Sequence, residues 1–369
     1  MTNTPTPCRW GILGTANIAR KNWQAILDSG NSRLVAVASR DAAKSARFVE
    51  ECQAAVPHPV LPAALGSYEE LIAHPEVDAI YFPLPTGIRK EWVIQAANAG
   101  KHVLVEKPVG CSTDDVAEIV AVCERNKVQF MDGVMFMHNE RLRQMRATLD
   151  DDKSVGGIRR ITSQFSFHGD EAFLRENIRA HSALEPHGCL GDLGWYCIRF
   201  TLWAMNWQPP IRVTGRILAE TTQAGAPGAV PTEFSGELFF DGGASASFFC
   251  SFIAENQQWA VVSGDKGLLR VSDFVLPFKD DHTRYSVTNS DFRVAGCQFD
   301  MIEGRQDVAV KEPSNNGAYS QEAELFRTFS ELVQSGKPDP HWPFIALQTQ
   351  TVMEACLRSA RDGSVCVAL

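Results

Sequence analysis

The sequence lacks the features that mark membrane, secreted and nucleic-acid-binding proteins. No apolar run in its 369 residues approaches the roughly 20 residues needed to cross a bilayer. Residues 1–7 are polar, without the basic-then-apolar order of a signal peptide. The net charge of −9 argues against a nucleic-acid surface, which draws on clustered Lys and Arg. We therefore expect a cytoplasmic protein with a loose N-terminal arm and neither a membrane nor a nucleic-acid partner.

The cysteines also lack a metal or redox pattern. There is no Cys-x-x-Cys pair, and Cys189 and Cys197 lie inside apolar segments, so we expect reduced core thiols with neither disulfide nor metal. What the chain does have is length and a globular composition. Its 369 residues, 44% hydrophobic and 21% charged, are enough for two domains that each bury a core.

The first third of the chain alternates short apolar runs with helical patterns. Runs without polar alternation are typical of strands that helices cover on both faces. Strands are expected at 9–14, 34–38, 77–82, 102–107 and 128–135, with helices at 19–27, from Ser67, at 91–99 and at 112–126. This order predicts an α/β fold with a doubly wound parallel sheet, a Rossmann NAD(P)-binding domain over residues 1–135.

The first strand breaks into a turn of small residues that opens a helix. Ala16 and Ala19 occupy the second and third glycine places of a relaxed dinucleotide fingerprint. Small residues at such spacing also occur where a helix merely packs closely, but here they follow a strand and precede a helix. We expect the backbone of this turn to bind a pyrophosphate through Gly14, Thr15, Ala16, Asn17 and Ile18.

The residues after the second strand bear on cofactor choice. Ser39 and Arg40, with Lys44 one helical turn on, stand where an acidic residue would bind a free ribose hydroxyl. They supply hydrogen-bond donors and positive charge, which favour NADP over NAD. The alternative is a solvated basic helix start.

Lys107 is expected at the carboxyl edge of the parallel sheet. Pro108 has no N–H for the ladder, so the strand must stop at Lys107. Ligands bind at this edge in open α/β sheets, although a single lysine after a strand is often only a solvated loop residue. The preceding strand ends at the same edge, and the residues expected beside the nicotinamide are Pro83, Leu84, Pro85, Thr86, Glu106 and Lys107.

The second half changes to alternating patterns typical of antiparallel strands. They lie at 158–167, 211–218, 234–240, 244–252 and 259–263, with a hairpin turn at Gly242-Gly243. Helices are expected at 139–149, 318–333 and 344–360, and residues 273–316 as long loops over the sheet. We expect an α+β substrate and oligomerisation domain over residues 136–369, whose open sheet joins a homodimer or homotetramer.

A nearly all-apolar run, Leu193 to Met205, predicts a buried helix. Asp192 and Tyr196 are four residues apart at its start and share one face. Asp192 alone could be a charge favoured by the helix dipole, and Tyr196 alone a core tyrosine. Two ionisable groups on one face, in a chain that carries a nucleotide fold, favour a functional role.

Three stretches together resemble the glucose-fructose oxidoreductase and inositol dehydrogenase family (Gfo/Idh/MocA). They are residues 10–19, 99–108 and 191–196, and the similarity extends over the chain. The branch it looks most like contains NADP-dependent aldose dehydrogenases, such as xylose dehydrogenase, and dihydrodiol dehydrogenases. The resemblance implies hydride transfer between nicotinamide and a sugar or polyol carbon bearing a hydroxyl. Arg89 departs from it, because many relatives carry a histidine there.

The resemblance places the catalytic residues on Lys107, Asp192 and Tyr196. Tyr196 would be the acid/base; a phenol is a weak base near neutral pH, so a nearby Lys107 ammonium would help it ionise. Asp192 would orient Lys107 or accept a substrate hydroxyl. The substrate-pocket candidates are Lys107, His138, Arg175, Asn177, Arg179, His187, Asp192 and Tyr196. The alternatives are a trans-dihydrodiol dehydrogenase, a keto-sugar reductase, or a non-catalytic NADP-sensing regulator.

Overall fold

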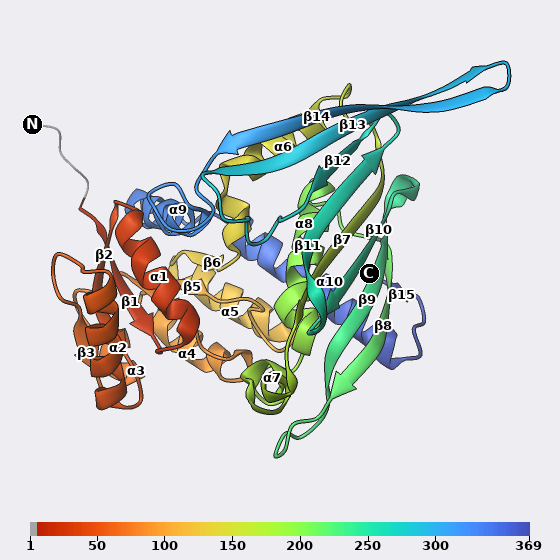
Figure 1. The fold of residues 1–369 in the computed structure, drawn as a ribbon. Coiled ribbons are helices and arrows are strands. Elements are labelled where there is room, and N and C mark those ends of the chain that lie inside the picture. Colours follow the sequence, from red (N-terminus) through yellow and green to blue (C-terminus); the bar gives the residue numbers. More distant parts are fainter. Residues whose placement is uncertain (1–5) are drawn as a thin grey trace, which may run out of the picture. The chain divides into compact units, whose positions relative to one another are not determined.

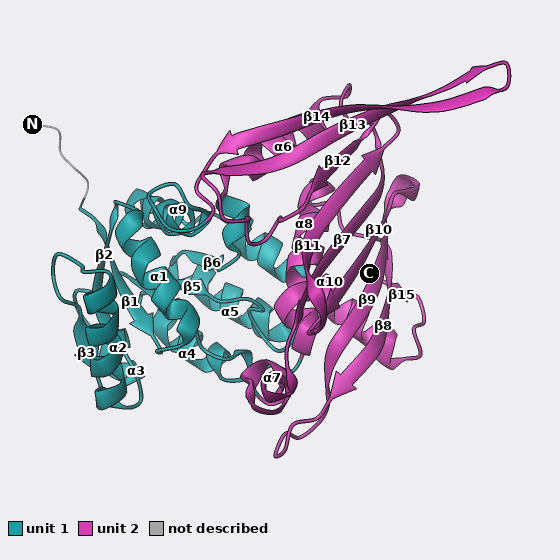
Figure 2. Cartoon of the chain, viewed as in Figure 1, with its two compact units in different colours: residues 1–138, 184–186, 315–350 teal, residues 139–183, 187–314, 351–369 magenta. Residues whose placement is uncertain are grey.

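The structure, a computed structural model, describes residues 6–369 and divides into two compact units (Figures 1 and 2). Within the described residues, the first unit contains 6–138, 184–186 and 315–350. The second contains 139–183, 187–314 and 351–369. Residues 1–5 of the expected N-terminal arm lie outside the described residues.

The first unit contains a six-stranded parallel sheet, as predicted for a doubly wound fold. Its strands run in the order β3-β2-β1-β4-β5-β6. They are β1 (Cys8–Leu13), β2 (Ser32–Ala38), β3 (Ala63–Leu65), β4 (Ala79–Phe82), β5 (His102–Val105) and β6 (Phe130–Asp132). The last is shorter than the expected strand 128–135, because the chain turns into a 3₁₀ helix, η1 (Met135–His138).

Helices α1 (Asn17–Asp28), α2 (Ala42–Ala55), α3 (Tyr68–Ile72), α4 (Thr86–Asn98) and α5 (Thr113–Asn126) connect these strands. Local capping explains several starts. The Ser67 and Ser112 hydroxyls accept from backbone N–H groups three residues on, at 3.2 Å and 3.1 Å. Helix α4 begins at Thr86, five residues before the predicted start at residue 91, directly after Pro85. Proline has no N–H to leave unsatisfied there.

The first unit also includes a helix from near the end of the chain. Helix α9 (Gln321–Ser335) packs on β1, where the Trp10 ring centroid lies 4.9 Å from those of both Phe326 and Phe329. On the opposite face of β1, Gly11 lies against Leu71 of α3. The sheet is thus covered on both faces, which is why its strands show no polar alternation. The unit therefore differs from the continuous segment 1–135, since it includes residues 315–350.

The second unit contains a nine-stranded sheet in the order β14-β13-β12-β11-β7-β10-β9-β8-β15. Its pairs are antiparallel except β7 with β10, which confirms the predicted mostly antiparallel sheet. The strands are β7 (Ile158–His168), β8 (Arg212–Thr221), β9 (Val230–Phe239), β10 (Ser245–Ser251), β11 (Ile253–Gly264), β12 (Leu268–Val271), β13 (His282–Ala295), β14 (Gln298–Lys311) and β15 (Val367–Ala368). The Gly242-Gly243 turn, η4 (Asp241–Gly243), joins β9 to β10.

The remaining helices are α6 (Glu140–Asp150), α7 (Glu171–Glu176), η2 (Ile178–Ala180), a π-helical turn η3 (Leu190–Gly194), α8 (Trp195–Ala204) and α10 (His341–Arg361). In the second unit η3 and α8 pack against β7 and β10. Cys189 and Cys197, which were expected in the core, are buried free thiols. No helix in residues 6–369 is long and apolar enough to cross a membrane.

The prediction of long loops over residues 273–316 is wrong. Most of this segment forms β13 and β14, two 14-residue strands that pair along their whole length and extend as a ribbon (Figure 1). Residues 289–307 are exposed. The apolar residues of β13 lie on one face at Tyr285 and Val287 and on the other at Phe292 and Val294, so no single period-two pattern runs along the strand.

One buried ion pair stabilises the second unit. The Arg141 guanidinium, on α6, pairs with the Asp273 carboxylate and also donates to the Asp273 carbonyl at 2.8 Å. Its side chain is 1% exposed, whereas Arg143 on the same helix is 72% exposed and pairs with Glu140.

We expect Arg141→Met to lower the free energy of unfolding by about 3–5 kcal/mol, because it leaves the buried Asp273 carboxylate without a counter-charge. Urea denaturation followed by circular dichroism measures the change. Arg143→Met is the matched control and should leave the urea midpoint unchanged. Equal effects of the two substitutions would contradict this interpretation.

Candidate active site

The ends of β4 and β5 define the first half of the candidate site. The two strands are parallel neighbours, with Phe82 opposite Val105 in the ladder. The segments that follow them, Pro83 to Thr86 and Glu106 to Lys107, therefore emerge at the same edge of the sheet, as the sequence predicts. The peptide bond between Lys107 and Pro108 is cis.

The turn after β1 has the geometry of a pyrophosphate site. Gly14 has φ +119°, a conformation that other residues rarely adopt, and a Cβ there would lie 3.0 Å from Leu84 Cδ2. Helix α1 follows directly, and within the described chain no side chain caps its start and no acidic residue stands in its first turn. Exposed helix N–H groups and a close glycine backbone fit the phosphates of a dinucleotide.

The residues after β2 present positive charge to solvent. Arg40 and Lys44 are exposed, and Ser39 is buried. The adjacent acidic residue, Asp41, caps α2, since its carboxylate accepts from Ala43 N at 2.9 Å and from Lys44 N at 3.3 Å. That carboxylate is therefore engaged by the backbone of α2. This arrangement leaves basic side chains to meet a phosphate.

Tyr68 lies beside the same basic residues. Burial raises the pKa of the Tyr68 phenol, and a hydrogen bond with the Arg40 guanidinium opposes that shift. The Tyr68 ring also meets Trp92 edge-on, with centroids 5.0 Å apart. Arg40 therefore has a buried aromatic partner, Tyr68, which no local sequence pattern predicts.

Glu185 and Thr86 form a contact that the sequence analysis missed. The Glu185 carboxylate accepts from the Thr86 backbone N–H at 3.0 Å and from the Thr86 hydroxyl at 2.6 Å. Gly87 N also donates to the Leu184 carbonyl at 2.8 Å. The first turn of α4 therefore binds Leu184 and Glu185. Thr86, predicted to lie beside the nicotinamide, uses its hydroxyl in this contact.

Arg89 lies inside the first unit and does not line its surface. It is 2% exposed, and its guanidinium donates to the carbonyls of Leu84, Glu106 and Pro108. Burial lowers its pKa, and the Glu185 and Glu106 carboxylates oppose that shift. The residue that departs from the family's histidine is therefore a buried cross-link between the ends of β4 and β5.

Glu106 is fixed by a second buried residue. The Tyr81 hydroxyl donates to Glu106 Oε1 at 2.6 Å. Burial and the neighbouring Glu106 charge raise the pKa of Tyr81 well above its ordinary value, so its phenol stays protonated and donates. Gly133 leaves room for the carboxylate, because a Cβ there would lie 3.2 Å from Glu106 Oε1.

The second unit carries Asp192 and Tyr196. The α-helix expected from Leu193 begins at Trp195, and Asp192 lies before it in the π-helical turn η3. Such wider turns occur often at functional sites, and they change the angular spacing on which the one-face expectation depended. The Asp192 carboxylate pairs with Arg179 Nε at 2.9 Å. Tyr196 is 6% exposed and meets the Phe165 ring edge-on.

The other predicted pocket residues have different surroundings. Arg175 is exposed and lies 3.7 Å from Glu171, its ion-pair partner. The Asn177 side chain caps η2 by accepting from Arg179 N at 3.1 Å. His187 is buried in the second unit, and His138, in the first unit, stacks on Trp342 with centroids 4.7 Å apart. Of these candidates, the structure shows Arg179 paired with a proposed catalytic residue.

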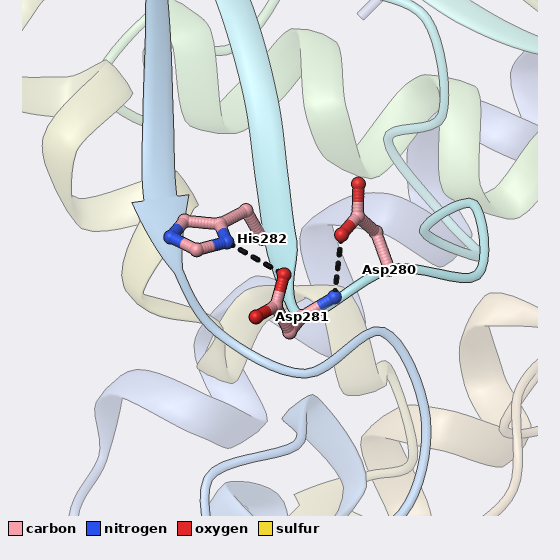
Figure 3. Close-up of side chains that lie close together, drawn as sticks. All are labelled: Asp280, Asp281 and His282. Atoms are coloured by element: carbon pink, nitrogen blue, oxygen red, sulfur yellow. Dashed lines mark hydrogen bonds and ion pairs between the residues drawn. The ribbon is translucent and has the colours of Figure 1, made fainter.

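One group of possible metal ligands lies close together in the described part of the chain: Asp280, Asp281 and His282 (Figure 3). His282 Nδ1 lies 2.8 Å from the Asp281 carboxylate. Asp280 pairs with the Arg284 guanidinium, which holds the pKa of that carboxyl well below its usual range. A cation there would have to displace arginine from an exposed carboxylate, so we assign no metal to this group.

Comparison with known proteins identifies the class. Residues 8–134 match the oxidoreductase family with the NAD-binding Rossmann fold (GFO_IDH_MocA), and residues 142–270 match the GFO/IDH/MocA C-terminal domain. The chain belongs to the Gfo/Idh/MocA oxidoreductase family. It is an NAD(P)-dependent oxidoreductase acting on CH–OH groups, which confirms the predicted enzyme class and argues against a non-catalytic sensor.

Three relatives show how far the similarity reaches. The chain is 32% identical to D-xylose 1-dehydrogenase (NADP(+)) 2 of Haloferax volcanii, over 96% of this chain and 98% of the relative. It is 30% identical to trans-1,2-dihydrobenzene-1,2-diol dehydrogenase of Mus musculus, over 73% and 76%. The solved aldose-aldose oxidoreductase of Caulobacter crescentus, complexed with glycerol, is 22% identical, with a TM-score of 0.79 over 98% of this chain and 100% of that one.

The segment before Asp192 depends on a glycine. Gly188 has φ +49°, and a Cβ there would lie 2.2 Å from the Pro231 carbonyl oxygen on β9. We expect Gly188→Ala to destabilise the protein by at least about 2 kcal/mol and to displace the segment leading to Asp192. Thermal unfolding and turnover measure the two effects.

Gly228→Ala is the matched control, since a Cβ at Gly228 meets no atom within 4 Å. The two alanine variants should separate clearly in melting temperature. A Gly188→Ala protein with normal stability would show that the close approach to β9 is not needed.

Proposed function

We propose that the chain is an NADP-dependent sugar dehydrogenase, with an aldose as substrate. The observation that supports this most is the 32% identity, over nearly the full length of both chains, to an enzyme named as an NADP-dependent D-xylose 1-dehydrogenase. The chain also carries Lys107, Asp192 and Tyr196 at the positions that the family's motifs assign to catalysis. A polar set of Arg179, Asn177 and His187 suits a substrate with many hydroxyls.

The proposed reaction oxidises a carbon that bears a hydroxyl. A dinucleotide bound at the edge of the parallel sheet would supply the hydride acceptor, nicotinamide C4. Tyr196 takes the hydroxyl proton, and the C–O bond becomes a carbonyl as the hydride leaves that carbon. The Lys107 ammonium favours the ionised form of the phenol, which makes Tyr196 an effective base near neutral pH. Asp192, held by Arg179, orients Lys107 or accepts a second substrate hydroxyl.

A trans-dihydrodiol is the second candidate substrate, favoured by the 30% identity to a dihydrodiol dehydrogenase over 73% of this chain. We place it second because that match covers less of the chain. Keto-sugar reduction is the same chemistry in the reverse direction.

We expect Tyr196→Phe and Lys107→Ala each to lower kcat by about 10²–10⁴-fold while NADPH still binds, because they remove the proton acceptor or its neighbouring charge. Turnover is followed by nicotinamide absorbance with a panel of aldoses, inositols and one dihydrodiol, and binding by NADPH fluorescence. Tyr285→Phe, which removes a hydroxyl 3.0 Å from Thr148 Oγ1 in the second unit, is the control. Normal turnover in either Tyr196→Phe or Lys107→Ala would contradict the proposed acid/base mechanism.

The cofactor proposal is NADP, supported by the exposed Arg40 and Lys44 and by Asp41 being used as a helix cap. We expect Arg40→Ala with Lys44→Ala to lower kcat/KM for NADP⁺ by about 10–100-fold and to leave NAD⁺ almost unaffected, because only the 2′-phosphate needs the two cations. Arg47→Ala removes one charge from the same helix and is the control. An equal loss with both cofactors would contradict a phosphate-reading role.

We also propose that the protein forms a homo-oligomer through the C-terminal sheet. The β13–β14 ribbon supports this, because two cross-strand pairs, Phe292 with Met301 and Val294 with Phe299, expose more than half of each side chain on one face. The opposite face carries the pair Arg293 and Asp300. An exposed apolar face on a two-stranded ribbon suits an isologous contact with a second copy.

We expect Phe299→Ser with Met301→Ser to reduce the mass in solution to that of a smaller assembly, as measured by light scattering. Arg293→Ser with Asp300→Ser, on the other face, should leave the mass unchanged. If neither pair changes the mass of an oligomeric protein, the ribbon is not the interface.

A further inference from the structure

Arg89 contacts the backbone on both sides of Lys107. Its Nη1 donates to the Glu106 carbonyl at 2.6 Å and also to the Pro108 carbonyl. The Thr86 hydroxyl lies 3.4 Å from the same Pro108 oxygen. The two peptide carbonyls that flank Lys107 are therefore held by one guanidinium. The backbone on either side of the proposed catalytic lysine is therefore held in place by Arg89.

The same guanidinium reaches the neighbouring strand. Arg89 Nε donates to the Leu84 carbonyl at 2.9 Å, and Nη2 donates to the same oxygen. Arg89 is the fourth residue of α4, which begins at Thr86. One side chain thus joins the end of β4, the start of α4 and the segment after β5. These are the segments expected to surround the nicotinamide.

The chemistry of this contact requires arginine. A planar guanidinium carries five N–H donors in a fixed fork, so it can satisfy three carbonyls that lie in different directions. A lysine ammonium is a compact group that cannot span them, and the neutral imidazole frequent in relatives has one donor. The charge is matched as well, because Glu185 and Glu106 favour the charged form of Arg89.

We propose that Arg89 is a positioning residue that fixes Lys107 for catalysis. This inference rests on the proposed function, in which Lys107 acts on Tyr196. A displacement of about 1 Å in a catalytic group can cost about 10²-fold in rate, so the carbonyl contacts matter although Arg89 is 2% exposed. Arg89 acts through Lys107 and need not touch the substrate.

The first test is a double-mutant cycle between the two residues. We expect Arg89→Lys to lower kcat by about 10–100-fold, with KM and the Kd for NADPH changing less than about threefold. In a Lys107→Ala background, the same Arg89→Lys change should cause almost no further loss, because the lysine that it positions is gone. Equal losses in both backgrounds would overturn the inference.

The second test is chemical rescue. Arg89→Ala leaves a buried space lined by carbonyls, and added guanidinium ion should restore part of kcat, whereas added methylammonium should restore less. For sugar oxidation, the acidic limb of the pH profile should move to higher pH in Arg89→Lys, because a displaced Lys107 supports ionisation of the Tyr196 phenol less well. If guanidinium does not restore kcat in an Arg89→Ala protein that folds and binds NADPH, the Arg89 guanidinium does not position Lys107.

A buried arginine elsewhere separates positioning from general destabilisation. Arg141 is equally buried and also donates to backbone carbonyls, but it belongs to the second unit. Arg141→Lys should lower the melting temperature without moving the pH profile. If Lys107→Ala keeps normal turnover, the proposed function fails. If Lys107→Ala is inactive but Arg89→Lys has the wild-type kcat and pH profile, only the Arg89 inference fails.

Discussion

The parallel pairing of β4 with β5 is the constraint on which the candidate site depends. Because neighbouring strands run in the same direction, the segments after Phe82 and Val105 leave the sheet at one edge, and the carbonyls of Leu84, Glu106 and Pro108 lie beyond the end of the ladder. Arg89 supplies donors to those carbonyls, and the Glu106 and Glu185 carboxylates balance its charge. One guanidinium thereby joins the end of β4 to the backbone on both sides of Lys107.

In the second unit, the Asp192 carboxylate lies among apolar residues. Asp192 lies in a π-helical turn that is otherwise buried, and its pairing with Arg179 offsets the cost of partial burial. Tyr196 follows in α8, where its ring meets Phe165 of β7 edge-on. Helix α8 packs on one face of the mostly antiparallel sheet. The β13–β14 ribbon lies at one edge of that sheet, and its far end is exposed.

Local signals in the sequence predicted the first unit well, and long-range contacts account for what they missed. The short apolar strands, the Ser112 cap and the Gly14 turn follow from pattern and propensity, and so does the shared edge that carries Lys107. The Thr86–Glu185 contact joins residues 99 apart in the chain, and no local pattern reports it. The return of α9 to the first sheet is of the same kind. The β13–β14 ribbon was missed because the apolar residues of β13 change faces between Val287 and Phe292. The π turn was missed because one residue inserted into a helical turn leaves no periodic trace.

In the proposed reaction, this chain moves a hydride from a sugar carbon to NADP⁺. The most direct measurement uses aldoses deuterated at C1, with NADP⁺ and the purified protein, and weighs the dinucleotide product by mass spectrometry. We predict NADPH that is heavier by one deuterium, formed more slowly than the unlabelled product. NADPH without deuterium would mean that another carbon is oxidised. Bound NADPH without turnover on any sugar or diol would contradict the claim.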